Sequence, residues 1–337
     1  MKRVAIVGFG FMGRMHYGNW KKIDTVRVTA ICDANLAQLT TCTSGNLAGA
    51  DMTTDFTGVA IYENWVAMLA AGGFDVVDIT LPTLLHPSAV MAALEAGYHV
   101  LCEKPMALDV SDCDRMLDAA RRTGKTLLVA HCLRFWPEYR TLRQLIELGR
   151  YGGIVAADFR RSSPIPDAKG PHGWFLDEKK SGGCLLDLHI HDIDFILSLF
   201  GSPESVSASA HWRHDGVIDH VHVCYDYPGR VVTSSVSWAV APTFGFEATF
   251  RVELERATIV FDGLRKEPFR VYPQEGTPFT PEMSEQNAYE SELRYFIGLL
   301  DGTSDPAFLT SEDGRRVVSL VSAIRASIAD STSAPSA

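Results

Sequence analysis

Three ionisable side chains lie at positions where they could take part in proton transfer. Asp187 and His191 are four residues apart in a long apolar run, so on a helix they share one face. Because a buried helix rarely holds ionisable groups without partners, they form either a self-contained pair in the core or a proton-transfer pair for a reaction. Lys104 follows a strand-like run and is either a surface charge or a cation that faces a ligand. Pro105 fixes the direction of the chain after Lys104, which favours the ligand-facing interpretation.

A glycine motif near the N-terminus predicts a dinucleotide site. Val4 to Val7 is a short apolar run rich in β-branched residues, and a GxGxxG motif follows it at once. Gly8 permits a tight turn, Gly10 lets the backbone approach a pyrophosphate, and Gly13 lets helix and strand pack closely. The helix that follows offers free N–H groups and a positive dipole end to phosphates. The predicted cofactor-binding residues of this stretch are Gly8, Phe9, Gly10, Phe11, Met12 and Gly13.

Asp33 closes the next apolar run, twenty residues after Gly13. A carboxylate at this place can accept hydrogen bonds from the ribose hydroxyls of an adenosine, although Asp is also a common helix N-cap. The same charge would repel a 2′-phosphate, and Ala34 and Asn35 supply no compensating cation. The residue therefore favours NAD over NADP as the cofactor.

The elements around these residues alternate between strand and helix as far as residue 130. Apolar runs bounded by turn residues predict strands, and the runs between them predict helices. This alternation predicts an α/β fold with a parallel, doubly wound sheet. The predicted strands are 4–7, 26–32, 75–80, 98–102 and 126–130, and the predicted helices are 11–22, 34–44, 63–71, 87–96 and 111–122.

The pattern changes after His131, where consecutive strand-like runs with short connections predict a large, mostly antiparallel sheet. We expect a nucleotide-binding domain over 1–130, an α+β substrate and oligomerisation domain over 131–305, and a C-terminal helix over 306–330 that packs back near the first domain. The expected strands are 154–161, 204–212, 219–227, 230–239, 246–254 and 257–261, and the expected helices are 138–148, 183–200, 284–300 and 311–329. Residues 162–181 are expected to form a loop over a site and 331–337 a disordered tail.

Composition limits the class of protein. A chain of 337 residues with 46% hydrophobic and 21% charged residues is typical of a soluble two-domain protein. The formal net charge of −10 argues against a nucleic acid or an anionic membrane as partner, since both require clustered Lys and Arg. Seven cysteines without C-x-x-C spacing indicate thiols in a reducing compartment, and no run is long enough to span a membrane. We therefore expect a cytoplasmic protein.

Other side chains could line a pocket for a sugar or polyol. Arg134, Tyr139 and Trp174 offer hydrogen bonds and ring stacking, although Tyr139 and the neighbouring Phe135 could equally pack against helices. His189 is a further candidate for contact with the substrate. It stands two residues before His191, and residues two apart on a helix point in different directions, so we expect no metal site there. The remaining histidines of the second half lie on strand-like runs and are expected at the sheet surface.

Taken together, the motifs resemble those of the glucose–fructose oxidoreductase, inositol dehydrogenase and MocA family of pyridine-nucleotide enzymes. The resemblance covers residues 1 to about 200, and beyond them it is one of layout. It rests on Gly8 to Gly13 with His16, on Thr80-Leu81-Pro82 with His86, on Gly97 to Pro105, on Arg134-Phe135-x-Pro137-x-Tyr139, and on Gly182-Gly183-x-Leu185-x-Asp187-x-x-x-His191.

The resemblance implies a Rossmann domain and adds site residues. It implies that Thr80, Pro82 and His86 contribute to cofactor binding and that Glu103, otherwise a solvent-facing acid, lies on the cofactor side. It also implies that the open face of the second sheet forms a homodimer or homotetramer. His189 replaces a small residue that the family often has at this position, which leaves the choice of substrate open.

These observations predict an NAD-dependent dehydrogenase that oxidises a secondary hydroxyl of a sugar, cyclitol or polyol. His191, oriented by Asp187, is the candidate base, and Lys104 would polarise the reacting oxygen, although Lys104 and His191 could exchange roles. One alternative is a glycosidase of the same fold that uses NAD for transient oxidation. Another is a non-catalytic NAD-binding regulator, which would have no need of all three side chains.

Overall fold

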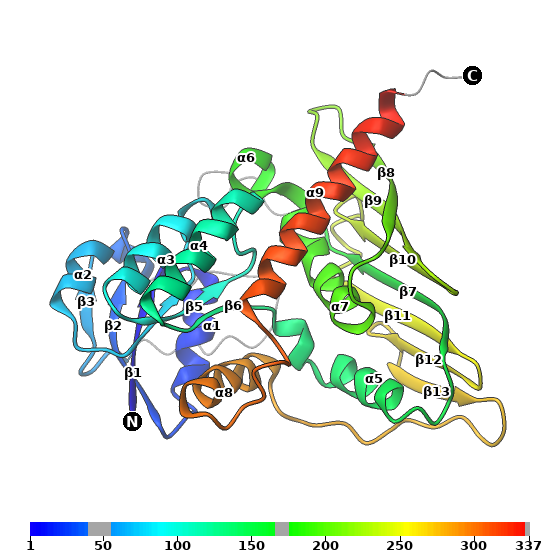
Figure 1. Cartoon of the computed structure of the whole chain (residues 1–337), viewed down its shortest axis with the longest axis horizontal. Helices are drawn as coiled ribbons and strands as arrows, with labels where there is room; N and C mark the ends of the chain where they lie inside the picture. The colour runs from blue at the N-terminus through cyan, green and yellow to red at the C-terminus, as the bar shows by residue number, and fades with distance from the viewer. Residues whose placement is uncertain (40–54, 166–174, 334–337) are drawn as a thin grey trace. The chain divides into compact units, whose positions relative to one another are not determined.

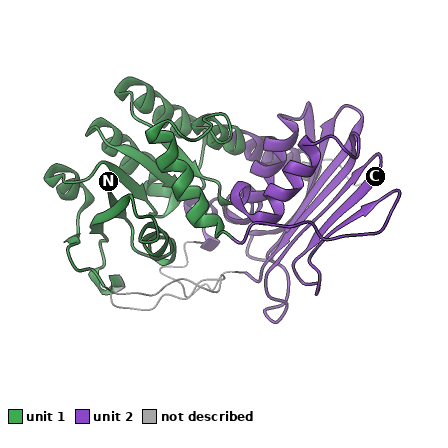
Figure 2. Cartoon of the chain, turned by 90° about the horizontal axis from the view of Figure 1, so that it is seen from below, with its two compact units in different colours: residues 1–132, 286–318 green, residues 133–285, 319–337 purple. Residues whose placement is uncertain are grey.

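The computed structural model describes residues 1–39, 55–165 and 175–333. It divides into two compact units, of which unit 1 comprises Met1–Cys132 and Gln286–Val318 and unit 2 comprises Leu133–Glu285 and Ser319–Ala337 (Figure 2). The first boundary agrees closely with the expected one at residue 130. Residues 286–305, expected in the second domain, belong to unit 1 instead.

The sheet of unit 1 has six strands, all parallel, in the order β3-β2-β1-β4-β5-β6. The order reverses between β1 and β4, which is the switch point where sheets of this kind bind ligands at the carboxyl ends of their strands. Every residue of β4 and β6 is buried, so both faces of the sheet are covered. The strands are β1 (Lys2–Val7), β2 (Val26–Cys32), β3 (Ala60–Tyr62), β4 (Val76–Ile79), β5 (His99–Glu103) and β6 (Leu127–Ala130).

Two groups of helices cover this sheet (Figure 1). Helices α2 (Trp65–Ala71), α3 (His86–Glu95) and α4 (Val110–Thr123) pack side by side, and α1 (Phe11–Trp20) packs against α8 (Ala288–Asp301). Arg294 of α8 also donates a hydrogen bond of 2.9 Å from Nη2 to the carbonyl oxygen of Lys22, just after α1. This packing explains why residues 286–305 belong to unit 1. Short 3-10 turns complete the unit at η1 (Leu36–Leu39), η2 (Thr83–Leu85) and η3 (Cys132–Phe135), the last of which crosses the unit boundary.

The helix expected over 34–44 is absent from the described residues after β2, which end at residue 39. The chain forms only the short turn η1 there, and residues 40–54 lie outside the described part. The Asn35 amide donates to Oδ1 of Asp33 at 2.8 Å, and the Ala37 amide donates to Oδ1 of Asn35 at 3.2 Å. Such side-chain acceptors compete with the helical hydrogen-bond pattern and favour turns.

The second sheet, in unit 2, has seven strands in the order β13-β12-β11-β7-β10-β9-β8. Only the β7–β10 pair is parallel, which confirms the expected mostly antiparallel sheet. The strand β13 has no counterpart in the predicted set, and neither has β3 of unit 1. The strands are β7 (Ile154–Ser162), β8 (Ser205–Trp212), β9 (Ile218–Tyr227), β10 (Arg230–Ser237), β11 (Glu247–Leu254), β12 (Ala257–Asp262) and β13 (Phe269–Pro273).

Buried and more exposed residues alternate along these strands, so the sheet has one covered face and one open face. The covered face packs against α5 (Pro137–Glu147) and α7 (Ile190–Phe200), and α9 (Ser311–Ser333) lies along it as well (Figure 1). Its core is aromatic, since the ring of Tyr139 contacts those of Phe195 and Phe250 at centroid distances of 4.8 and 5.2 Å. The open face carries polar side chains such as Asp158 and Arg160.

The apolar run 183–200 is helical as predicted, but it is not one regular helix. A short helix α6 (Glu178–Ser181) ends at Gly182, and Gly183 also has a positive φ. A π-helical segment η5 (Leu185–His189) then leads into α7. Segments of π-helix are rare and often lie at functional sites.

Helix α9 begins in unit 1 and ends in unit 2. In unit 1, Ser311 Oγ donates 2.7 Å to the carbonyl oxygen of Leu127, and in unit 2, Arg325 Nη2 donates 2.6 Å to that of Gly182. The helix continues to Ser333, so the first residues of the tail expected to be disordered are helical, and 334–337 lie outside the described part. Over the described residues, no helix is both long enough and apolar enough to cross a membrane.

Candidate functional site

The glycine turn between β1 and α1 is built as the motif predicts. Gly8 has a φ of +92°, and a Cβ at Gly8 would lie 2.8 Å from the carbonyl oxygen of Thr80. A Cβ at Gly13 would overlap the carbonyl oxygen of Gly8 and lie 3.0 Å from Thr80 Oγ1. A Cβ at Gly10, by contrast, would have no heavy atom of the described residues within 4 Å. Gly8 and Gly13 are therefore required for packing within the protein, whereas Gly10 borders open space.

The open space at Gly10 lies at the start of α1. Gly10 is the N-cap of this helix and has no side chain to accept hydrogen bonds from the first turn. The N–H groups of that turn thus carry the partial positive charge of the helix end without a side-chain cap. This arrangement fits a pyrophosphate, which needs several N–H donors and a close approach to the backbone.

Asp33 follows β2 and lies beside the same turn. Its Oδ2 accepts a hydrogen bond of 2.7 Å from the Phe9 amide, and its Oδ1 accepts one from Asn35. Both interactions hold the carboxylate in place, and an ionised carboxylate can accept further bonds at each oxygen. Asp33 therefore caps only the short turn before η1 and not a regular helix. Its contact with the ribose hydroxyls stays a prediction.

The loop after β4 contains Thr80, Pro82 and His86. Thr80 Oγ1 donates a hydrogen bond of 2.5 Å to the Gly8 carbonyl oxygen, so it ties this loop to the glycine turn. Pro82 is exposed at the start of η2. His86 is buried, with Nδ1 2.8 Å from the Pro105 carbonyl oxygen and Nε2 2.7 Å from that of Leu81. Burial lowers the pKa of His86, and its contacts make it a link between two loops rather than an exposed cofactor contact.

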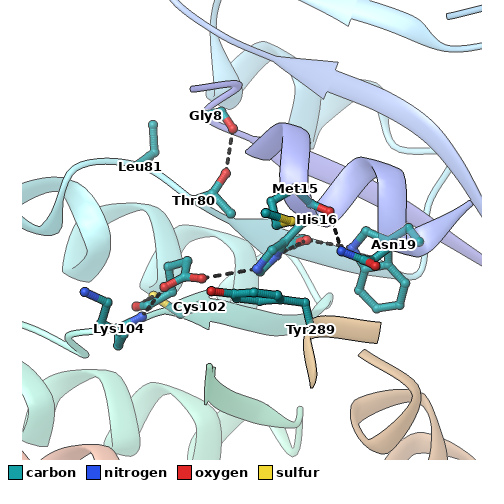
Figure 3. A network of polar contacts seen from close by, with 12 residues as sticks. Gly8, Met15, His16, Asn19, Thr80, Leu81, Cys102, Lys104 and Tyr289 are labelled. Carbon is teal, nitrogen blue, oxygen red and sulfur yellow. Dashed lines mark hydrogen bonds and ion pairs between the residues drawn. The ribbon is translucent and has the colours of Figure 1, made fainter. Parts of the chain in front are cut away.

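Lys104 lies directly after the carboxyl end of β5. The preceding Glu103 is 6% exposed, which excludes the interpretation of Glu103 as a solvent-facing acid. Its Oε2 accepts a hydrogen bond of 3.0 Å from the Lys104 amide, and the Lys104–Pro105 peptide bond is cis. The half-buried side chain of Lys104 points away from the buried group around His16 (Figure 3).

His16, on α1, is fully buried between two carboxylates (Figure 3). Its Nδ1 lies 2.9 Å from Oδ2 of Asp78, and its Nε2 lies 3.1 Å from Oε1 of Glu103. Burial by itself lowers the pKa of His16, but the charges and hydrogen bonds of the two acids more than offset it and hold this pKa well above its ordinary value. Trp20 adds a hydrogen bond of 2.7 Å from Nε1 to Asp78. The interior of unit 1 therefore holds a charged bridge that joins α1, β4 and β5.

In unit 2, Asp187 and His191 are distinguished by their exposure. Asp187 lies on η5 and His191 on the first turn of α7. Between Ser181 and Leu197 these two residues are partly exposed, and all the remaining residues are buried. Their side chains thus reach the surface of an otherwise buried segment, as residues that share one helix face would.

Arg134 and Tyr139, two predicted substrate residues of unit 2, are buried, unlike Asp187 and His191. Arg134 is 3% exposed and pairs with Asp194 through Nε and Nη2, at 2.8 and 2.6 Å. Tyr139 is fully buried, and its hydroxyl accepts a hydrogen bond of 3.1 Å from Arg161. The structure supports the packing alternative for Tyr139 and the buried Phe135, and it places Arg134 in a buried ion pair. Their position in the core does not support a contact with substrate, because partners within the unit surround their polar groups.

His189 is also part of the core of unit 2. Its side chain is fully buried, and Nε2 lies 2.7 Å from the hydroxyl of Ser234 on β10. Burial and the nearby charge of Arg161 lower the pKa of His189 to about 3, so the ring is neutral at physiological pH. The predicted substrate contact of His189 is therefore not supported either. Trp174, the remaining candidate, lies outside the described residues.

Comparison with known proteins identifies the family. Residues 2–131 match the model of an oxidoreductase family with an NAD-binding Rossmann fold, GFO_IDH_MocA, and residues 139–260 match its C-terminal domain. The 1,5-anhydro-D-fructose reductase of Ensifer adhaerens is 31% identical over 251 residues, which are 71% of this chain and 73% of that protein. The chain belongs to the Gfo/Idh/MocA family of oxidoreductases.

Other similar proteins differ in how much of their length is matched. The D-glucoside 3-dehydrogenase of Escherichia coli is 30% identical over 215 residues, or 62% of this chain. The chain spans 57% of the length of that relative and 43% of the trans-1,2-dihydrobenzene-1,2-diol dehydrogenases of Macaca fuscata fuscata and Macaca fascicularis. An oxidoreductase from Agrobacterium radiobacter, crystallised with NAD+, L-tartaric acid and magnesium, has the same fold, with a TM-score of 0.80, 22% identity and coverage of 98% and 97% of the two chains.

Sequence reasoning found the glycine turn and the end of β5 but missed the buried bridge between them. His16 was recognised only as a landmark of the resemblance, without a role. Asp78 offered a signal that could have been used, because it stands in the middle of the apolar run Val76–Ile79. An acid within a strand buried on both faces needs partners, and His16 and Trp20 provide them.

Proposed function

We propose that this Gfo/Idh/MocA protein is an NAD-dependent dehydrogenase that oxidises a secondary hydroxyl of a sugar, cyclitol or related polyol. The observation that carries the proposal is the construction of unit 1, in which an uncapped helix N-terminus, the open space at Gly10 and the carboxylate of Asp33 adjoin one turn. Lys104 follows a strand of the same sheet at its carboxyl end. The names of two relatives, a glucoside dehydrogenase and an anhydrofructose reductase, support a sugar-like substrate.

The residues of unit 1 fit the adenine dinucleotide part of NAD. The N–H groups at the start of α1 would hold the pyrophosphate, and Gly10 would leave it room. Asp33 would accept hydrogen bonds from the ribose hydroxyls and disfavour a 2′-phosphate. When bound, NAD supplies the hydride acceptor that oxidation of an alcohol requires.

The reaction also requires the removal of a hydroxyl proton, and we assign this step to side chains of the chain itself. His191, a half-buried imidazole, accepts the proton, and Asp187 orients it. Lys104 donates a hydrogen bond to the reacting oxygen and stabilises the negative charge that develops on it. The exchange of roles between Lys104 and His191 stays open, because either side chain can accept a proton in its neutral form.

The proposal extends to assembly. The open face of the second sheet is the surface through which we propose that two or four copies associate. Its polar side chains include pairs such as Thr233 with Asp158, which are 2.7 Å apart across β10 and β7. Light scattering after size-exclusion chromatography should give the mass of a dimer or tetramer, and a strictly monomeric protein at micromolar concentration would contradict this part.

The function is tested with a panel of sugars, inositols and other polyols assayed for NADH formation. Lys104→Met keeps the aliphatic stem but removes the charge and the donors, so we expect kcat to fall about a hundredfold or more while NAD affinity changes far less. Lys266→Met, on the exposed turn after β12, is the matched control and should leave kcat unchanged. Near-normal turnover of Lys104→Met would make Lys104 a structural residue and refute its assignment.

A further inference from the structure

The buried bridge around His16 joins three elements of unit 1 and ends at the proposed catalytic lysine. Asp78 contributes from β4, His16 from α1 and Glu103 from the last position of β5. All three side chains are less than a tenth exposed. Glu103 uses one oxygen for His16 and the other for the Lys104 amide, at 3.1 and 3.0 Å. A continuous series of contacts therefore runs from Asp78 to the backbone of Lys104.

The contacts and charges around the His16 ring favour its doubly protonated form. Each nitrogen of His16 faces a carboxylate oxygen, and a carboxylate that is ionised can only accept. A neutral imidazole has one donor, so with both acids ionised it would leave one of these contacts as an acceptor facing an acceptor. The doubly protonated ring satisfies both contacts and reduces the charge of the buried group from two negative charges to one. This agrees with the pKa of Glu103, which burial raises but which His16 and Lys104 lower overall.

We infer that His16 is a positioning residue whose buried imidazolium fixes Glu103 and, through it, the backbone from which the Lys104 side chain reaches the substrate. This inference rests on the proposed role of Lys104. Glu103 and Lys104 are adjacent in the chain. If the Glu103 side chain rotates away from His16, its hydrogen bond with the Lys104 amide is lost. A displacement of about 1 Å at a reacting group can lower the rate about a hundredfold.

A purely structural bridge is the alternative, and it predicts different results. Such a bridge would affect only the stability of unit 1, whereas a positioning residue also changes kcat in the folded enzyme. Four other groups lie near the bridge: the Trp20 indole, the Cys102 thiol, the buried imidazole of His86 and the Tyr289 phenol. The test must leave these side chains unchanged. The variants below therefore replace only His16 and Glu103.

The activity test uses His16→Gln in the full chain, with His214→Gln at an exposed position as the matched control. We expect His16→Gln to lower kcat about tenfold to a hundredfold with little change in the KM for NAD, and the control to match the unmutated protein. Because His16 acts through Lys104, adding His16→Gln to Lys104→Met should lower kcat by less than about threefold further. Full additivity of the two losses, or a normal kcat in folded His16→Gln, would overturn the inference.

Two readouts do not depend on the substrate and separate this inference from the proposed function. In the unmutated protein, nitrogen-15 spectra of the histidine rings should show one ring, absent from His16→Gln, that keeps protons on both nitrogens well above the pH at which exposed histidines lose one. The Lys104 amide should exchange its hydrogen at least about tenfold faster in His16→Gln than in the control. A neutral His16 ring, or unchanged exchange at Lys104, would overturn the inference even in an active dehydrogenase.

Glu103→Gln provides a second variant in case His16→Gln does not fold. It keeps the shape of the side chain and removes one of the two buried negative charges. A single amide oxygen cannot serve the Lys104 amide and the His16 ring as two carboxylate oxygens do, so kcat should fall in the same direction. A folded Glu103→Gln with unchanged kcat and unchanged exchange at Lys104 would refute the positioning role.

Discussion

Replacement of two glycines of the same turn by alanine should separate cofactor binding from folding. At Gly10 the backbone has φ −71°, which alanine adopts readily, and within the described part of the chain no heavy atom lies within 4 Å of the new Cβ. The Gly10→Ala protein should therefore fold normally and be up to about 1 kcal/mol more stable, because alanine restricts the unfolded chain. If the pyrophosphate lies against Gly10, the methyl group should weaken NAD binding at least about tenfold, or about 1.4 kcal/mol.

Gly13→Ala should behave in the opposite way. Its Cβ would overlap the Gly8 carbonyl oxygen and crowd Thr80 Oγ1, so β1 and α1 must move apart. Overpacking of this kind costs about 1–3 kcal/mol, which should appear as a lower melting temperature of the free protein. Calorimetric titration with NAD and thermal melts without NAD measure the two effects. Unchanged NAD affinity in Gly10→Ala would refute the assignment of the pyrophosphate to this turn, and an unchanged melting temperature in Gly13→Ala would refute the packing argument.

Two further predictions concern Asp33 and the core of unit 2. The unmutated protein should prefer NAD over NADP about tenfold or more, and Asp33→Ser should reduce this preference mainly by weakening NAD binding, whereas equal affinity for both cofactors in the unmutated protein would contradict the assignment. Asp192→Asn leaves the buried guanidinium of Arg161, now held at 2.7 and 2.8 Å, without its full counter-charge, so unfolding of unit 2 should become easier by about 3–5 kcal/mol. Asp118→Asn breaks an exposed pair on α4 and should change stability by less than about 1 kcal/mol, so equal shifts of the urea midpoint in both variants would count against this reasoning.

The parts of the fold that were predictable from sequence are those set by local pattern. The strands of unit 1 are apolar because both faces are covered, and the glycines of the turn mark the place where strand and helix touch. The segment after Asp33 was predicted as a helix because its composition suits one, whereas the Asp33 and Asn35 side chains accept backbone hydrogen bonds and favour a turn. Strand β3 has three residues, which are too few to show the alternation of apolar and polar residues that predicts a strand.

Long-range partners were the part of the site that could not be read from the sequence. Arg134 and His189 have the residue types of a sugar pocket, but Asp194 and Ser234 hold them in the core. Nothing in the local pattern identifies such a partner, because Ser234 is 45 residues away from His189 in the chain. His16 was hidden for the same reason, since its two carboxylates lie on separate strands.

The central claim is that the chain transfers hydride from a secondary alcohol to NAD, and the ratio of NADH to oxidised product tests it most directly. With the best polyol or sugar of the panel, the account predicts one NADH released for each molecule of ketone formed, and loss of both in Lys104→Met. Cleavage of a glycosidic bond with bound NAD and no accumulation of NADH would contradict the claim in favour of an NAD-assisted glycosidase. Tight NAD binding without turnover of any alcohol in the panel would contradict it in favour of a regulator.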